Sequence, residues 1–202
     1  MKNLIIIPSR LESSRLPNKP LADINGEPMI VHVYKRAKEA NIGNVIVAAG
    51  NTEIKEVIEN VGGDAILTNP NHASGSDRIY EALRLYDKDS SYNNIINLQG
   101  DLPNIQKNAL TKIVTLLNSG DSDVSTLGIK ISSDHEVLNP NIVKAYVKSL
   151  SENNHVDDFD RSFDLSKKDF LYHHIGIYGY KRTALESFIG FNQSKAEIDR
   201  KL

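Results

Sequence analysis

The chain has 202 residues, of which 40% are hydrophobic, a formal net charge of -2 and no cysteine. This length allows one sizeable core, so we expect a single domain. The near-neutral charge does not favour nucleic acid as a partner, and the lack of cysteine excludes disulfides and thiolate metal sites. No apolar run has the length of a signal peptide or a membrane span, so we expect a soluble cytoplasmic protein without a membrane partner.

Strand-like apolar runs alternate with helical stripes along the N-terminal part of the chain. Leu4–Ile7 is a continuous apolar run, typical of a strand buried on both faces. Similar runs follow at Val45–Ala49, Ala65–Leu67 and Ile95–Leu98. Between and after them, apolar residues at i, i+3, i+4 and i+7 predict helices whose stripes begin at Ile30, Ile54, Ile79 and Leu110. This alternation predicts an α/β fold, with a mostly parallel mixed sheet and helices on both faces.

After Thr126 the alternation weakens. Ile142–Val147 and His174–Tyr180 predict further strands, and the polar segment Ser149–Asp169 predicts a loop. The final stretch SKAEIDRKL has a helical pattern without a glycine or proline stop signal. We therefore expect the chain to end within the domain.

A basic segment follows the first predicted strand. PSRLESSRLPNKPL carries Arg10, Arg15 and Lys19 beside Ser13 and Ser14, and these side chains could hold a polyphosphate. The segment matches neither GxxxxGK[ST] nor GxGxxG, which excludes a P-loop and a dinucleotide fingerprint. A solvated surface loop is the alternative reading of the same residues.

Three further polar motifs lie in or after predicted strands. In NHASGSDR, Ser74 and Gly75 can present backbone N–H groups to an anion, although Ser76 could simply cap the next helix. In INLQGDLP, Asp101 could hold Mg²⁺ together with phosphate oxygens and water, or belong to an ordinary turn. In HHIGIYGY, alternate residues could form a polar pocket wall or simply pack. Because ligands bind at the carboxyl ends of parallel strands, we expect PSRLESSRLPNKPL, NHASGSDR and INLQGDLP to converge in space.

In this order, PSRLESSRLPNKPL, HASGSDR, QGDLP and HIGIYGY resemble the 3-deoxy-manno-octulosonate cytidylyltransferase family, also called CMP-Kdo synthetases. The resemblance runs from Leu4 to the last residue. It implies transfer of CMP from CTP to the acid sugar Kdo with Mg²⁺ as the cofactor and pyrophosphate as the second product. It also implies the nucleotide-diphospho-sugar transferase type of fold, a homodimer and a role in lipopolysaccharide biosynthesis.

The resemblance also implies roles for individual residues. Arg10, Lys19 and Asp101 would be catalytic, and Asp101 would bind the metal. The nucleotide-binding residues would be Arg10, Ser13, Ser14, Arg15, Lys19, His72, Ser74, Gly75 and Arg78. The sugar-binding residues would be Gln99, His174, Tyr178 and Glu197. Compared with the family pattern, the chain would be one nucleotidyltransferase domain over residues 1–202 that lacks a C-terminal metal-binding Asp.

Two other functions stay open at this point. The chain could transfer CMP to a different acid sugar, such as an 8-amino Kdo analogue or a nonulosonate. Alternatively, it could be a truncated, non-catalytic nucleotide-binding protein.

Overall fold

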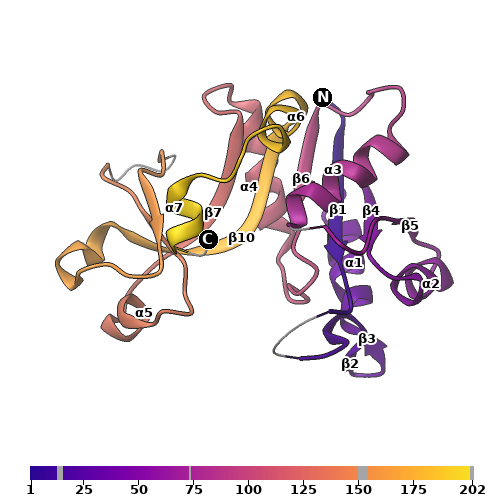
Figure 1. The fold of residues 1–202 in the computed structure, drawn as a ribbon, viewed down its shortest axis with the longest axis horizontal. Helices are drawn as coiled ribbons and strands as arrows, with labels where there is room; N and C mark the ends of the chain where they lie inside the picture. The colour runs from indigo at the N-terminus through magenta and orange to yellow at the C-terminus, as the bar shows by residue number, and fades with distance from the viewer. Residues whose placement is uncertain (13–15, 73, 150–153, 201–202) are drawn as a thin grey trace. The chain divides into compact units, whose positions relative to one another are not determined.

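The computed structural model describes residues 1–12, 16–72, 74–149 and 154–200 (Figure 1). They belong to two units. The first comprises Met1–Ser125 and Ile177–Gly190, and the second comprises Thr126–Gly176 and Phe191–Leu202. The expectation of a single domain over the whole chain stays a prediction. No helix in the described ranges is both long and apolar enough to cross a membrane.

The predicted parallel strands form the sheet of the first unit. They are β1 (Asn3–Ser9), β4 (Asn44–Ala49), β5 (Asp64–Leu67) and β6 (Asn94–Asn97), in the order β5-β4-β1-β6. Residues 178–181 of β10 (Leu171–Lys181) pair with β6 in the antiparallel direction. This confirms a mostly parallel mixed sheet. Its central strand is buried on both faces, with Leu4–Ile7 fully inaccessible to solvent.

Helices cover both faces of this sheet, as the apolar stripes predict. The four predicted helices are α1 (Met29–Glu39), α2 (Thr52–Asn60), α3 (Gly75–Tyr86) and α4 (Lys107–Asn118). On one face, α3 and α6 (Arg182–Ile189) pack against the even-numbered residues Leu4 and Ile6 of β1. Helix α1 also packs against β1 and β4, and it contacts α2 and α4.

A small hairpin precedes α1 and was missed in the sequence. Its strands β2 (Asp23–Ile24) and β3 (Glu27–Pro28) are joined by Asn25 and Gly26, both with positive φ. Asn-Gly is the characteristic pair of a tight hairpin turn, so the signal was available. The hairpin follows the short 3-10 helix η1 (Lys19–Leu21) and leads the chain into α1.

The second unit contains the antiparallel strands β8 (Lys144–Tyr146) and β9 (Asp158–Asp160), and β8 also pairs with residues 171–173 of β10. The remaining elements here are β7 (Val124–Lys130), which begins in the first unit, α5 (Asp134–Leu138), the 3-10 helix η2 (Leu165–Phe170) and α7 (Lys195–Arg200). The prediction of a plain loop over Ser149–Asp169 was wrong, because β9 and much of η2 lie within it. Strand β9 could not be recognised from hydrophobic periodicity, because its sequence is polar and its three residues are only partly buried.

Candidate active site

A cavity of about 260 Å³ lies at the carboxyl ends of the parallel strands of the first unit. Its walls come from the end of β1, from η1, from the start of α1, from the β5–α3 connection and from the segment after β6. The lining residues are Pro8, Ser9, Arg10, Lys19, Pro20, Met29, His72, Ser74, Gly75, Arg78, Gln99, Gly100 and Asp101. The predicted convergence of the three motifs is therefore confirmed. Ser13, Ser14 and Arg15 lie outside the described residues.

Lys19 and Asp101 join the opening loop to the segment after β6. Lys19 Nζ donates to Asp101 Oδ2 at 2.6 Å, and the two side chains are 36% and 48% exposed. Gly100, next to Asp101, comes close to the end of β1, since a Cβ at this position would be only 2.9 Å from the carbonyl oxygen of Pro8. This close approach of two strand ends places a cation and a carboxylate at the same mouth of the cavity.

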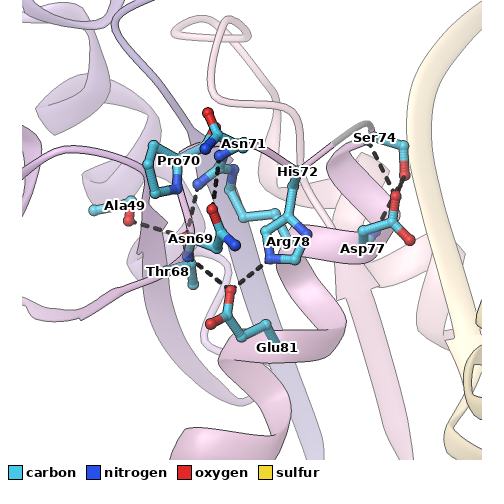
Figure 2. A network of polar contacts seen from close by, with 10 residues as sticks. All are labelled: Ala49, Thr68, Asn69, Pro70, Asn71, His72, Ser74, Asp77, Arg78 and Glu81. Carbon is cyan, nitrogen blue, oxygen red and sulfur yellow. Dashed lines mark hydrogen bonds and ion pairs between the residues drawn. The ribbon is translucent and has the colours of Figure 1, made fainter.

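Arg78 is the buried cation of the site. Its guanidinium donates to Thr68 Oγ1 at 2.7 Å and to the Pro70 carbonyl at 3.1 Å (Figure 2), and the residue is only 3% exposed. Burial lowers the pKa of Arg78 and the nearby Arg10 lowers it further, but a guanidinium stays charged at neutral pH. Arg78 therefore fixes the β5–α3 connection as well as lining the cavity.

Ser74, rather than Ser76, is the N-cap of α3. Ser74 Oγ accepts from the Asp77 backbone N–H at 3.1 Å, and Asp77 Oδ2 accepts from the Ser74 backbone N–H at 3.1 Å. This reciprocal pair is a capping box, whose S-x-x-D spacing begins at Ser74 and not at Ser76. The prediction for Ser76 was wrong by two residues, and the true cap places Gly75 in the first helical position at the cavity wall.

His72 is held at the edge of the cavity by Glu81. The Nε2 of His72 lies 2.5 Å from Glu81 Oε2, which also accepts from the Asn69 backbone N–H at 2.8 Å (Figure 2). Burial alone would raise the pKa of Glu81, but these two donors lower it. Sequence reasoning missed Glu81, because no local motif relates a helical Glu to a loop His nine residues earlier.

The residues assigned to the sugar are divided between the two units. Gln99 lines the cavity in the first unit, where Tyr178 pairs in register with Asn97. Burial, with a smaller effect of Tyr180, raises the pKa of Tyr178 to about 12. In the second unit, His174 lies 2.9 Å from Thr126 Oγ1, and burial, with His173 beside it, lowers its pKa to about 4.

Glu197, also in the second unit, helps to cap α7. Its carboxylate accepts from the Ser194 backbone N–H at 2.6 Å, while its own N–H donates to Ser194 Oγ. This contact accounts for its position without a ligand, and its role toward a sugar stays a prediction.

Comparisons with known proteins agree on the family of this chain. The family model described as "Cytidylyltransferase" matches residues 4–202. The 3-deoxy-manno-octulosonate cytidylyltransferases of Bartonella bacilliformis and Brucella ovis are 45% and 44% identical to this chain. These matches cover the whole chain and 84% and 81% of the two relatives. The chain belongs to the 3-deoxy-manno-octulosonate cytidylyltransferase family.

Solved structures agree with this membership of the 3-deoxy-manno-octulosonate cytidylyltransferase family. A CMP:2-keto-3-deoxy-manno-octonic acid synthetase complexed with CTP matches with a TM-score of 0.89 and 34% identity, over all of this chain and 83% of that one. A 4-diphosphocytidyl-2C-methyl-D-erythritol synthase from Anaerococcus prevotii matches with a TM-score of 0.62 and 12% identity, over 96% of this chain and 79% of that one, which shows the shared fold alone. The chain is a nucleotidyltransferase of this fold.

Proposed function

We propose that this protein transfers CMP from CTP to Kdo and releases pyrophosphate. The observation that supports this proposal most strongly is the convergence of Arg10, Lys19 and Asp101 on one cavity, in a chain 45% identical to a named 3-deoxy-manno-octulosonate cytidylyltransferase. From the resemblance to this family, we further propose a homodimer in the cytoplasm and a product used for lipopolysaccharide.

The proposed reaction needs positioning and charge neutralisation. A sugar hydroxyl oxygen forms a bond to the α-phosphorus of CTP and loses its proton to water, while the bond from the α-phosphorus to the bridging oxygen breaks and pyrophosphate leaves with the electron pair. Such a transfer requires no covalent nucleophile on the protein. Arg10 and Lys19 would neutralise the triphosphate, and cations already positioned on the cavity wall favour the transition state because they need little reorganisation during the reaction.

Three of the four side chains proposed for the acid sugar are neutral hydrogen-bonding groups, and the fourth, Glu197, is a carboxylate. We propose that Gln99, Tyr178, His174 and Glu197 bind this sugar. With a pKa of about 12, the phenol of Tyr178 keeps its proton at neutral pH, and with a pKa of about 4 the imidazole of His174 is uncharged there. These groups would select sugar hydroxyls by hydrogen bonds.

The decisive experiment is a pyrophosphate-release assay on this chain. CTP, UTP, ATP and GTP are each combined with Kdo, an 8-amino Kdo analogue and a nonulosonate. We expect turnover with CTP and Kdo above every other pair. Turnover with another sugar alone would contradict the Kdo assignment. Binding of CTP by calorimetry without any turnover would favour the non-catalytic alternative.

Asp101 has the donor chemistry that suits Mg²⁺. Mg²⁺ is often held by one or two carboxylates together with substrate phosphates and water, and Asp101 presents a half-exposed carboxylate beside the proposed triphosphate cations. No group of three or more His, Asp or Glu side chains suited to a metal occurs in the described part of the chain. Bound Mg²⁺ would neutralise phosphate oxygens, and the protein would hold it through Asp101.

Replacing Asp101 with Asn tests this metal assignment. In the native chain, we expect Mg²⁺ to raise the affinity for CTP measured by calorimetry. In Asp101→Asn that gain should fall at least about tenfold, because one charged contact of about 1.5–3 kcal/mol is lost. Thermal stability should hardly change, since an exposed ion pair contributes little. An unchanged Mg²⁺ effect in the variant would exclude Asp101 from the metal site.

A further inference from the structure

We propose that Glu81 is a positioning residue that prepares His72 to bind the nucleotide, an inference that rests on the proposed function. Glu81 does not line the 260 Å³ cavity, whereas His72 does. Both residues also line a second hollow of about 400 Å³, whose walls come mostly from α3. Glu81 can therefore act on a nucleotide through His72, which stands between the two hollows.

Glu81 fixes the connection to α3 at two points. Its Oε2 atom accepts from the Asn69 backbone N–H at 2.8 Å and lies 2.5 Å from the Nε2 of His72 (Figure 2). One helical turn earlier, Arg78 donates to the Pro70 carbonyl in the same connection. Two charged side chains of α3 thus hold residues 69–72, and Glu81 alone of the two bonds to the imidazole.

The charge of Glu81 determines the hydrogen-bonding role of His72. An ionised carboxylate has no proton to donate, so the Nε2 of His72 must carry the proton of this contact. That leaves the Nδ1 atom on the other part of the ring for a ligand, as an acceptor in the neutral form and as a donor in the imidazolium form. The contact therefore fixes which nitrogen of the cavity-lining ring carries the proton.

A substitution can remove the charge of Glu81 without removing its hydrogen bond to the backbone. Glu81→Gln keeps the length of the side chain and an oxygen that can accept from Asn69, but removes the negative charge. Glu56→Gln makes the same change of charge on the exposed face of α2, away from the cavity, and serves as the matched control. His72→Ala removes the group through which Glu81 is proposed to act.

A double-mutant cycle on CTP affinity, measured by calorimetry, tests the proposal. We expect Glu81→Gln to weaken CTP binding roughly 5- to 20-fold, as for losing one charge-assisted contact, and to raise KM with kcat changed less than about twofold. Glu56→Gln should bind like the native chain. In the His72→Ala background, Glu81→Gln should have no further effect, because the two residues act as a unit. Additive losses, or native affinity in Glu81→Gln, would overturn the inference.

A nitrogen NMR spectrum of the free protein provides an independent readout. We expect the proton of His72 to reside on Nε2 in the native chain and to be shared between both ring nitrogens in Glu81→Gln. The same protonation pattern in both proteins would overturn the inference whether or not CTP binds. If the native chain shows the expected spectrum and does not bind CTP, the proposed function fails and the contact between Glu81 and His72 stands.

Discussion

Two buried serines of the first unit differ in what their hydroxyls contact. Ser9 at the end of β1 and Ser125 in β7 are both 6% exposed. Ser125 Oγ donates to the Ile113 carbonyl at 3.3 Å, whereas Ser9 Oγ has no hydrogen-bond partner among the described residues. The backbone carbonyl of Ser9, in contrast, accepts from the Gly50 N–H at 2.8 Å.

Alanine substitutions at these two serines should have different effects on stability. Removing an unsatisfied buried hydroxyl is neutral or stabilising, so Ser9→Ala should leave the free energy of unfolding unchanged or raise it by up to about 1 kcal/mol. Ser125→Ala should lower it by about 1 kcal/mol, because a made hydrogen bond is lost. Urea unfolding of both variants measures the difference. An equal loss in the two variants would show that the Ser9 hydroxyl is stabilised in the folded chain.

For single residues, the sequence predicted which side chains lie together at the cavity but not which hydrogen bonds position them. Arg10, Lys19 and Asp101 could be placed together because each follows a strand, and strand ends share one edge of a parallel sheet. The bond from Arg78 to Thr68 and that from Glu81 to His72 could not be predicted, since they depend on the path of one loop. Long-range polar partners are set by tertiary geometry, which hydrophobic periodicity does not encode.

The helices and strands could be predicted where burial imposes a regular spacing of apolar residues along the sequence. The stripes of α1 to α4 and the apolar runs of β1 and β4 face a core on one or both sides, so most of their inward positions are apolar. The half-exposed elements of the second unit, such as β9 and η2, carry no such constraint. Their residues pair through the backbone, and backbone hydrogen bonds leave little trace in the sequence.

The junction between α3 and α6 is a buried polar contact within the first unit. Asp87, which ends α3, accepts from the backbone N–H groups of Ser91 and Tyr92 and pairs with Arg182 at the start of α6. Burial alone would raise the pKa of Asp87, but these donors lower it to about 2. No sequence pattern predicts this pair, since the two residues are far apart along the chain. It ties two helices of one face together through a single carboxylate.

For the whole molecule, acid should act on the two units in different pH ranges. In the second unit, the pKa of His174 is lowered to about 4, so the unfolded chain binds a proton that the folded chain does not between about pH 6.5 and 4. Stability is fully present above this range and falls as the pH decreases through it. In the first unit, the lowered pKa of Asp87 has the same sign, but its contribution is lost only between about pH 4 and 2.

Urea unfolding followed by circular dichroism at pH 7, 5 and 3 tests this ordering. We expect a first loss of stability between pH 7 and 5 and a further loss between pH 5 and 3. The shift of Asp87 corresponds to about 2 kcal/mol in total, because one pKa unit is about 1.4 kcal/mol. Asp87→Asn cannot ionise, so the variant should be less stable at pH 7 and should lose less stability below pH 4 than the native chain. If acid destabilises that variant and the native chain equally below pH 4, the Asp87 carboxylate is not the group that titrates.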